Sequence, residues 1–153
     1  WRLAWSLGDD PAAVVIKHAN PCGAAVAGDI TSAYRLAHEC DPDSAYGGIV
    51  AVNRTLPLSL AEALKPVFTE VLIAPDYEPA ALELLLSSKK NLRVLTARPP
   101  VVPSLELRTI EGGLLVQTPD AVSVDRSGWT VATEASAARI NGQGMGSPTE
   151  CRY

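Results

Sequence analysis

The chain has 153 residues, of which 47% are hydrophobic and 20% charged, and its formal net charge at pH 7 is −4. This balance is typical of a globular domain with a substantial core, and it gives no electrostatic reason to expect nucleic-acid binding. Apolar runs such as residues 84–86 are far shorter than the roughly 20 residues that span a bilayer, so membrane spanning is excluded.

The start of the chain bears on the expected cellular location and on whether the sequence is a fragment. The three cysteines are not accompanied by a signal-peptide pattern, so we expect no disulfide framework and a cytoplasmic location. The chain does not begin with methionine, and residues 1–7 form an amphipathic helical pattern that Gly8 and Pro11 terminate. We therefore expect a fragment of a longer protein.

The next elements alternate between strand and helix patterns. The apolar run at residues 13–16 has the length of a buried strand, and Asn20-Pro21 turns the chain shortly after it. A helix follows, which Asp29 or Thr31 caps and Asp41-Pro42 stops. Further along, the pattern predicts strands at 49–52, 71–74 and 92–95 and helices at 58–68, where Pro66 kinks or ends the helix, and at 80–86. This alternation predicts an α/β layered fold with a largely parallel or mixed sheet.

The character of the sequence changes after residue 97. Several prolines open an extended connector, and residues 105–116 alternate weakly around Gly112-Gly113, which predicts an edge hairpin or an excursion from the sheet. Residues 134–153 contain glycines and little apolar periodicity, so we expect this tail to be poorly ordered.

Lys17 and His18 form a basic pair at the end of the first strand. Adjacent residues of a regular strand point to opposite faces, so only a bend at the strand end lets both line one pocket. An ammonium close to an imidazole disfavours the imidazolium, which suits His18 as a general base, while Lys17 offers positive charge to a developing oxyanion. The alternative is structural: a lysine whose head reaches solvent and a hydrogen-bonded core histidine.

Cys22 raises two further possibilities. His18 followed by Pro21-Cys22 has part of the zinc deaminase pattern, but Ala25 occupies the place of the second cysteine, so the ligand set is incomplete and no metal is expected. A thiolate nucleophile at Cys22 remains an alternative to a small buried thiol.

One loop, one carboxylate and one lysine pair complete the candidate set. Residues 41–48 combine carboxylates, a hydroxyl and two glycines before a strand, as in a loop that lets a ligand approach the backbone, although an ordinary connection has the same composition. Glu70 stands at the start of the next strand, and Lys89-Lys90 fits a surface pair at a helix end.

Five blocks of this sequence resemble the bacterial bifunctional purine biosynthesis enzymes, in the order in which that family has them. The blocks are KHANPCGAAV (17–26), CDPDSAYGGIVA (40–51), EVLIAP (70–75), KKNLR (89–93) and GGLLVQ (112–117). The family combines phosphoribosylaminoimidazolecarboxamide (AICAR) formyltransferase with IMP cyclohydrolase, and the resemblance covers approximately residues 1–131.

The resemblance implies formyl transfer from 10-formyltetrahydrofolate, as cosubstrate, to the 5-amino group of AICAR. By position, His18 matches the proton acceptor and Lys17 the transition-state stabiliser of the family, and Gly47, Glu70 and Asn20 match residues that bind the nucleotide. The fold it implies is similar to that of cytidine deaminase, without zinc, in a cytoplasmic homodimer whose active sites lie between subunits.

The chain also departs from the family. This sequence does not include the family's cyclohydrolase domain or an upstream nucleotide-binding arginine, and residues 132–153 diverge from the family. We therefore expect residues 1–131 to correspond to the N-terminal part of the formyltransferase domain. We therefore expect little or no transferase activity from the chain alone. The alternatives are a catalytically inactive nucleotide-binding or dimerisation module and, more remotely, a thiol hydrolase that uses Cys22.

Overall fold

A mixed sheet of five strands forms the centre of the first of two units in this computed structural model, which describes residues 1–101 and 103–119. The strands are β1 (Ala12–Lys17), β2 (Asn20–Val26), β3 (Gly48–Val52), β4 (Thr69–Ala74) and β5 (Arg93–Thr96), in the order β2-β1-β3-β4-β5. β1 is antiparallel to both β2 and β3, whereas β3, β4 and β5 are parallel. The predicted α/β class is confirmed.

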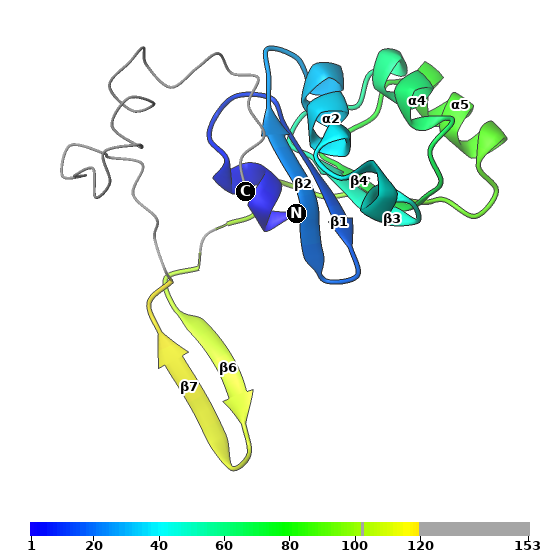
Figure 1. The fold of residues 1–153 in the computed structure, drawn as a ribbon. Helices are drawn as coiled ribbons and strands as arrows, with labels where there is room; N and C mark the ends of the chain where they lie inside the picture. The colour runs from blue at the N-terminus through cyan, green and yellow to red at the C-terminus, as the bar shows by residue number, and fades with distance from the viewer. Residues whose placement is uncertain (102, 120–153) are drawn as a thin grey trace, which may run out of the picture. The chain divides into compact units, whose positions relative to one another are not determined.

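Helices cover both faces of this sheet. They are α1 (Arg2–Ser6), α2 (Ile30–Glu39), α3 (Pro42–Ala45), α4 (Leu58–Leu64) and α5 (Pro79–Ser88). α2, α4 and α5 pack on one face, and α1 packs on the other against β1, as Figure 1 shows. The unit therefore has three layers.

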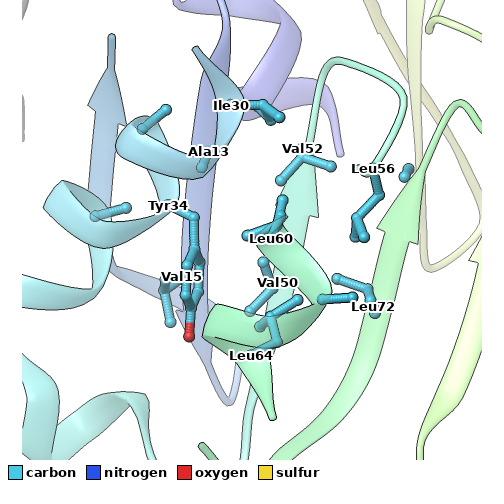
Figure 2. Close-up of a cluster of buried hydrophobic side chains, with 14 of the residues drawn as sticks. Ala13, Val15, Ile30, Tyr34, Val50, Val52, Leu56, Leu60, Leu64 and Leu72 are labelled. Atoms are coloured by element: carbon cyan, nitrogen blue, oxygen red, sulfur yellow. The ribbon is translucent and has the colours of Figure 1, made fainter. Parts of the chain in front are cut away.

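Alternation along β1 divides the core between the two faces. Ala13 and Val15 join the larger cluster beneath α2 and α4, which also contains Tyr34 of α2, Leu60 and Leu64 of α4 and Leu72 of β4 (Figure 2). The residue between them, Val14, joins the smaller cluster beneath α1. Since successive strand residues point to opposite faces, the apolar run of β1 is explained by burial on both sides.

Proline ends or begins two of these helices. α4 stops at Leu64, two residues before Pro66, which lacks the N–H that a further helical turn requires. α5 has Pro79 in its first turn, where that missing N–H costs nothing. The predicted end of the helix at Pro66 is confirmed.

The sequence prediction missed a strand directly after Lys17 and His18. Residues Asn20-Pro21, read as a turn, begin β2 and pair antiparallel with the end of β1, Ile16 opposite Pro21. β2 is the outermost strand on its side of the sheet, and a register shift lies between Val15 and Ile16. An edge strand with a bulge tolerates proline because the missing N–H breaks no ladder bond to a further strand.

The second unit contains the predicted hairpin. β6 (Glu106–Ile110) and β7 (Gly113–Gln117) pair antiparallel as a separate two-stranded sheet, so the hairpin is an excursion rather than an edge of the main sheet. Its turn places Gly112 at φ +76°, a left-handed conformation that glycine adopts without strain. The tail at residues 132–153 lies outside the described residues. None of the helices described in either stretch combines the length and apolar character needed to cross a membrane.

Asp29 caps α2 with its side chain, which makes stability sensitive to acid. Its carboxylate accepts hydrogen bonds from the hydroxyl of Ser32 (2.6 Å) and from the amide of Ser32 (2.9 Å), and these bonds lower the pKa of Asp29. A lowered pKa in the folded state means stability that is present above the unfolded pKa and lost as pH falls through the folded pKa.

We expect Asp29→Asn, which can still cap the helix, to lose this charge-dependent contribution. The difference in free energy of unfolding between the two proteins should be constant near neutral pH and shrink below about pH 4, the unfolded pKa of aspartate. Urea titrations across this range would measure it, with Glu83→Gln, at an exposed position of α5, as the control. A difference that stays constant into the acid range would contradict the role of the charge.

Candidate functional site

A two-residue turn places Lys17 and His18 at one end of the sheet. Lys17 is the last residue of β1 and pairs with Asn20, the first of β2, so that His18 and Ala19 form the turn between them. His18 has φ +58°, in the left-handed region. The bend predicted at this strand end is therefore present, and it frees the two side chains from the opposite-face rule of a regular strand. His18 is exposed and Lys17 half-buried.

The ammonium group of Lys17 is held by the backbone of a distant loop. Its Nζ donates to the carbonyl oxygen of Tyr46 at 2.8 Å and to that of Gly47 at 3.3 Å. An ammonium has three N–H donors, so this arrangement leaves one for a ligand. Two candidates that lie 30 residues apart in the sequence, Lys17 and the loop at 41–48, thus meet in one place.

Gly47 occupies a position that favours glycine. Its φ is +69°, and a Cβ added there would lie 3.1 Å from Nζ of Lys17 and 3.3 Å from Cε1 of Phe68. The amide of Gly47 donates to the carbonyl oxygen of Phe68 at 2.8 Å. The protein's own lysine and phenyl ring therefore lie close to the backbone of this loop, and the approach of a ligand to it stays a prediction.

Glu70 lies in an irregularity of the adjacent strand. Gly48 pairs with Thr69 and Ile49 pairs with Val71, so the register between β3 and β4 skips Glu70. Such an extra residue re-aims its side chain relative to the regular pleat. Because β1 runs antiparallel to β3, the end of β1 and the starts of β3 and β4 lie at the same end of the sheet. We call this line of strand ends the edge that carries the candidate site; it is distinct from the outer strand β2. Lys17, Gly47 and Glu70 therefore all belong to this edge, and Asn20 is exposed beside the turn.

Two aromatic residues that the sequence analysis did not select also stand here. The rings of Tyr46 and Phe68 have centroids 5.2 Å apart and are tilted by 48°. Their exposed fractions are 67% and 43%, large for aromatic side chains. The sequence carried little signal for them, because an aromatic residue in a loop is not distinctive without its neighbours.

A cavity of about 300 Å³ adjoins the same edge, and its lining includes Phe68, Thr69, Lys89 and Lys90. Nζ of Lys89 donates to the carbonyl oxygen of Val67 at 2.6 Å, and burial lowers the pKa of Lys89. The predicted lysine pair does lie at the end of α5, with Lys90 exposed, but Lys89 is half-buried and bonded to the backbone. The parallel order of β4 and β5 brings the segment before β5 to the edge where β4 begins, which a residue pattern alone does not reveal.

Cys22 has the environment of an unreactive thiol. It is half-buried, and its Sγ donates to the carbonyl oxygen of Val15 at 3.5 Å. Burial, followed by the charge of Asp41, raises the pKa of Cys22, which disfavours the thiolate that a nucleophile needs. In the stretches 1–101 and 103–119, no three histidine, cysteine, aspartate or glutamate side chains gather as a potential metal site.

Comparison with known proteins gives consistent matches over most of the chain. The family model described as AICARFT/IMPCHase bienzyme matches residues 1–144. Two relatives named bifunctional purine biosynthesis protein PurH, from Mycobacterium leprae strains Br4923 and TN, are each 45% identical over 141 residues. The alignment covers 90% of this chain and 26% of each relative, so the chain spans about a quarter of the length of these curated relatives.

Proposed function

This chain belongs to the AICARFT/IMPCHase bienzyme family, and we propose on that basis that it forms one wall of a site for formyl transfer to AICAR in purine biosynthesis. The formyl donor in this proposal is 10-formyltetrahydrofolate. The observation that carries the proposal is that Lys17, the neighbour of His18 in the chain, is hydrogen-bonded to the carbonyl oxygens of Tyr46 and Gly47 at the end of β1.

His18 is the proposed proton acceptor. The 5-amino group of AICAR is a poor nucleophile because its lone pair is delocalised into the imidazole ring and the carboxamide, so positioning and base assistance both matter. The amine nitrogen attacks the formyl carbon, and a new C–N bond forms as the amine proton passes to His18. The bond from that carbon to N10 of the folate then breaks, and N10 takes up a proton.

Lys17 is the proposed stabiliser of the oxyanion that develops on the formyl oxygen. Two backbone carbonyls hold its ammonium and leave one N–H to donate. A donor fixed in advance costs little reorganisation when the charge develops. Gly47, Glu70 and Asn20, on the same edge, are the proposed contacts to the nucleotide, in the setting of a cytoplasmic homodimer with sites between subunits.

Binding of AICAR and catalysis of formyl transfer can be tested separately. Because the chain spans about a quarter of its PurH relatives, we expect it to bind AICAR but to catalyse little or no transfer by itself. Calorimetric titration of AICAR into the chain and into Lys17→Ala, together with a formyl-transfer assay, tests this. Binding without turnover is also what a nucleotide-binding or dimerisation module would show. Failure of AICAR to bind at millimolar concentration would contradict both the proposed formyl-transfer site and an inactive module that binds the nucleotide.

Lys89 and Lys90 provide a sharper test, because AICAR carries a phosphate and these lysines line the neighbouring cavity. We propose that they hold this phosphate. A hydrogen bond between charged groups contributes about 1.5–3 kcal/mol, so Lys89→Ala should weaken AICAR binding roughly 10–100-fold.

The corresponding riboside, which lacks the phosphate, should bind equally to wild type and Lys89→Ala. Lys65→Ala, an exposed lysine at the end of α4, is the matched control and should bind AICAR like the wild type. Equal losses for AICAR and the riboside would place Lys89 outside the phosphate contact.

A further inference from the structure

We propose that Phe68 is a positioning residue for Lys17, and that it acts through the Tyr46-Gly47 turn. Its consequence for catalysis rests on the function proposed above, whereas its effect on Lys17 can be measured independently. Phe68 precedes β4 directly, one residue after Val67, which accepts a hydrogen bond from Lys89.

Phe68 contacts both residues whose carbonyls hold the ammonium group. Its backbone carbonyl oxygen accepts a hydrogen bond from the amide of Gly47 at 2.8 Å, which places the ring next to the peptide unit between Tyr46 and Gly47; this bond itself does not depend on the side chain at position 68. The carbonyl of Tyr46 belongs to that unit, and it is the closer acceptor of Lys17, at 2.8 Å. The ring of Phe68 also packs on the ring of Tyr46, with centroids 5.2 Å apart.

The ring also bounds the space beside the ammonium. A Cβ placed on Gly47 would lie 3.1 Å from Nζ of Lys17 and 3.3 and 3.4 Å from two ring carbons of Phe68. The ammonium and the ring edge therefore both lie close to the same point beside Gly47. A smaller side chain at position 68 would open this point, and both the turn and the lysine would gain freedom.

The exposure of Phe68 makes this role testable. With 43% of the residue exposed, its truncation removes less buried area than truncation of a core residue such as Leu72 would. The fold should therefore survive the change, while a contact that acts on Lys17 is lost.

The experiment follows the lysine ammonium groups directly, by NMR of the full chain labelled with ¹⁵N-lysine. In the wild type, the ammonium protons of Lys17 and Lys89 should exchange slowly with water, because each group is half-buried and bonded to a carbonyl. In Phe68→Ala, proton exchange at Lys17 should accelerate at least about tenfold, the equivalent of one net hydrogen bond, while Lys89 keeps its slow exchange.

Two further variants make the result decisive. Phe68→Tyr keeps the ring and should restore slow exchange at Lys17. Phe68→Leu keeps apolar bulk without the ring edge and should accelerate proton exchange at Lys17. If Phe68→Ala unfolds and loses the Lys89 signal, Phe68→Leu replaces it as the test of the positioning role. Leu86→Ala, which truncates a 56% exposed side chain on α5, is the control and should change neither lysine.

Unchanged exchange at Lys17 in folded Phe68→Ala or Phe68→Leu would overturn the proposal, as would equal acceleration at Lys17 and Lys89. Titration of AICAR into the same proteins separates this inference from the proposed function. If Lys17 is loosened as expected but wild type fails to bind AICAR, then the positioning role stands and the proposed function fails.

Discussion

Replacement of His18 by alanine should lower the rate of formyl transfer about 10²–10⁴-fold, the usual contribution of a positioned general base. The test places this sequence into the Mycobacterium leprae PurH relative, where it replaces the matching 26% of that protein, so that the remaining walls of the site are supplied. The loss should appear in kcat, with the KM for AICAR nearly unchanged, because the proton moves only as the reaction proceeds.

The second histidine of the chain gives a matched control. His38 is half-buried near the end of α2, with its ring 5.9 Å from that of Tyr34, and it is not part of the proposed site. His38→Ala should leave kcat within about twofold of the parent chimera, since it touches no reacting atom. Equal activity of the chimera and its His18→Ala variant would rule out His18 as the base.

The largest loss of stability is expected from Gly23→Ala in β2. A Cβ at this position would lie 1.8 Å from the carbonyl oxygen of Ala37 and 2.9 Å from its carbon. These are backbone atoms of α2, so no flexible side chain can move aside to relieve the overlap. Strand or helix must shift, and the cost should reach or exceed the upper end of the roughly 1–3 kcal/mol typical of overpacked cores.

Gly28→Ala is the control for that substitution, because a Cβ at Gly28 would meet no atom within 4 Å. Urea denaturation followed by circular dichroism should show a lower midpoint for Gly23→Ala and a nearly unchanged one for Gly28→Ala. Equal midpoints for the two variants would show that α2 and β2 are not packed as closely as described.

Much of the fold was predictable because its signals are local. The cap of α2 at Asp29, the end of α4 before Pro66 and the apolar run of β1 each follow from a few adjacent residues. β2 was missed because its first residues, Asn20-Pro21, have the local preference of a turn. Pairing with β1 at the sheet edge overrides that preference, and pairing is not visible in a local window.

The site was predictable only in part, for a related reason. The bend at His18 and the special conformation of Gly47 follow from the punctuation of the sequence around them. The tie between Lys17 and Tyr46 does not, because its acceptor is a backbone carbonyl, which every residue possesses. Phe68 and Lys89 come close to the candidate site through the parallel order of β3, β4 and β5, which a local pattern does not reveal. Their roles stay predictions until the variants are measured. The same holds for the roles of Lys17, His18, Gly47, Glu70 and Asn20.

The backbone acceptors of Lys17 also determine which mutations this edge tolerates. The side chain at position 46 does not hold the ammonium, so any residue that preserves the turn and packs against Phe68 keeps the same acceptor in place. Position 47 has less freedom, because its positive φ favours glycine and a Cβ there would lie 3.1 Å from Nζ of Lys17 and 3.3 Å from the phenyl ring. Saturation mutagenesis should therefore find that position 46 tolerates many residues while position 47 strongly favours glycine.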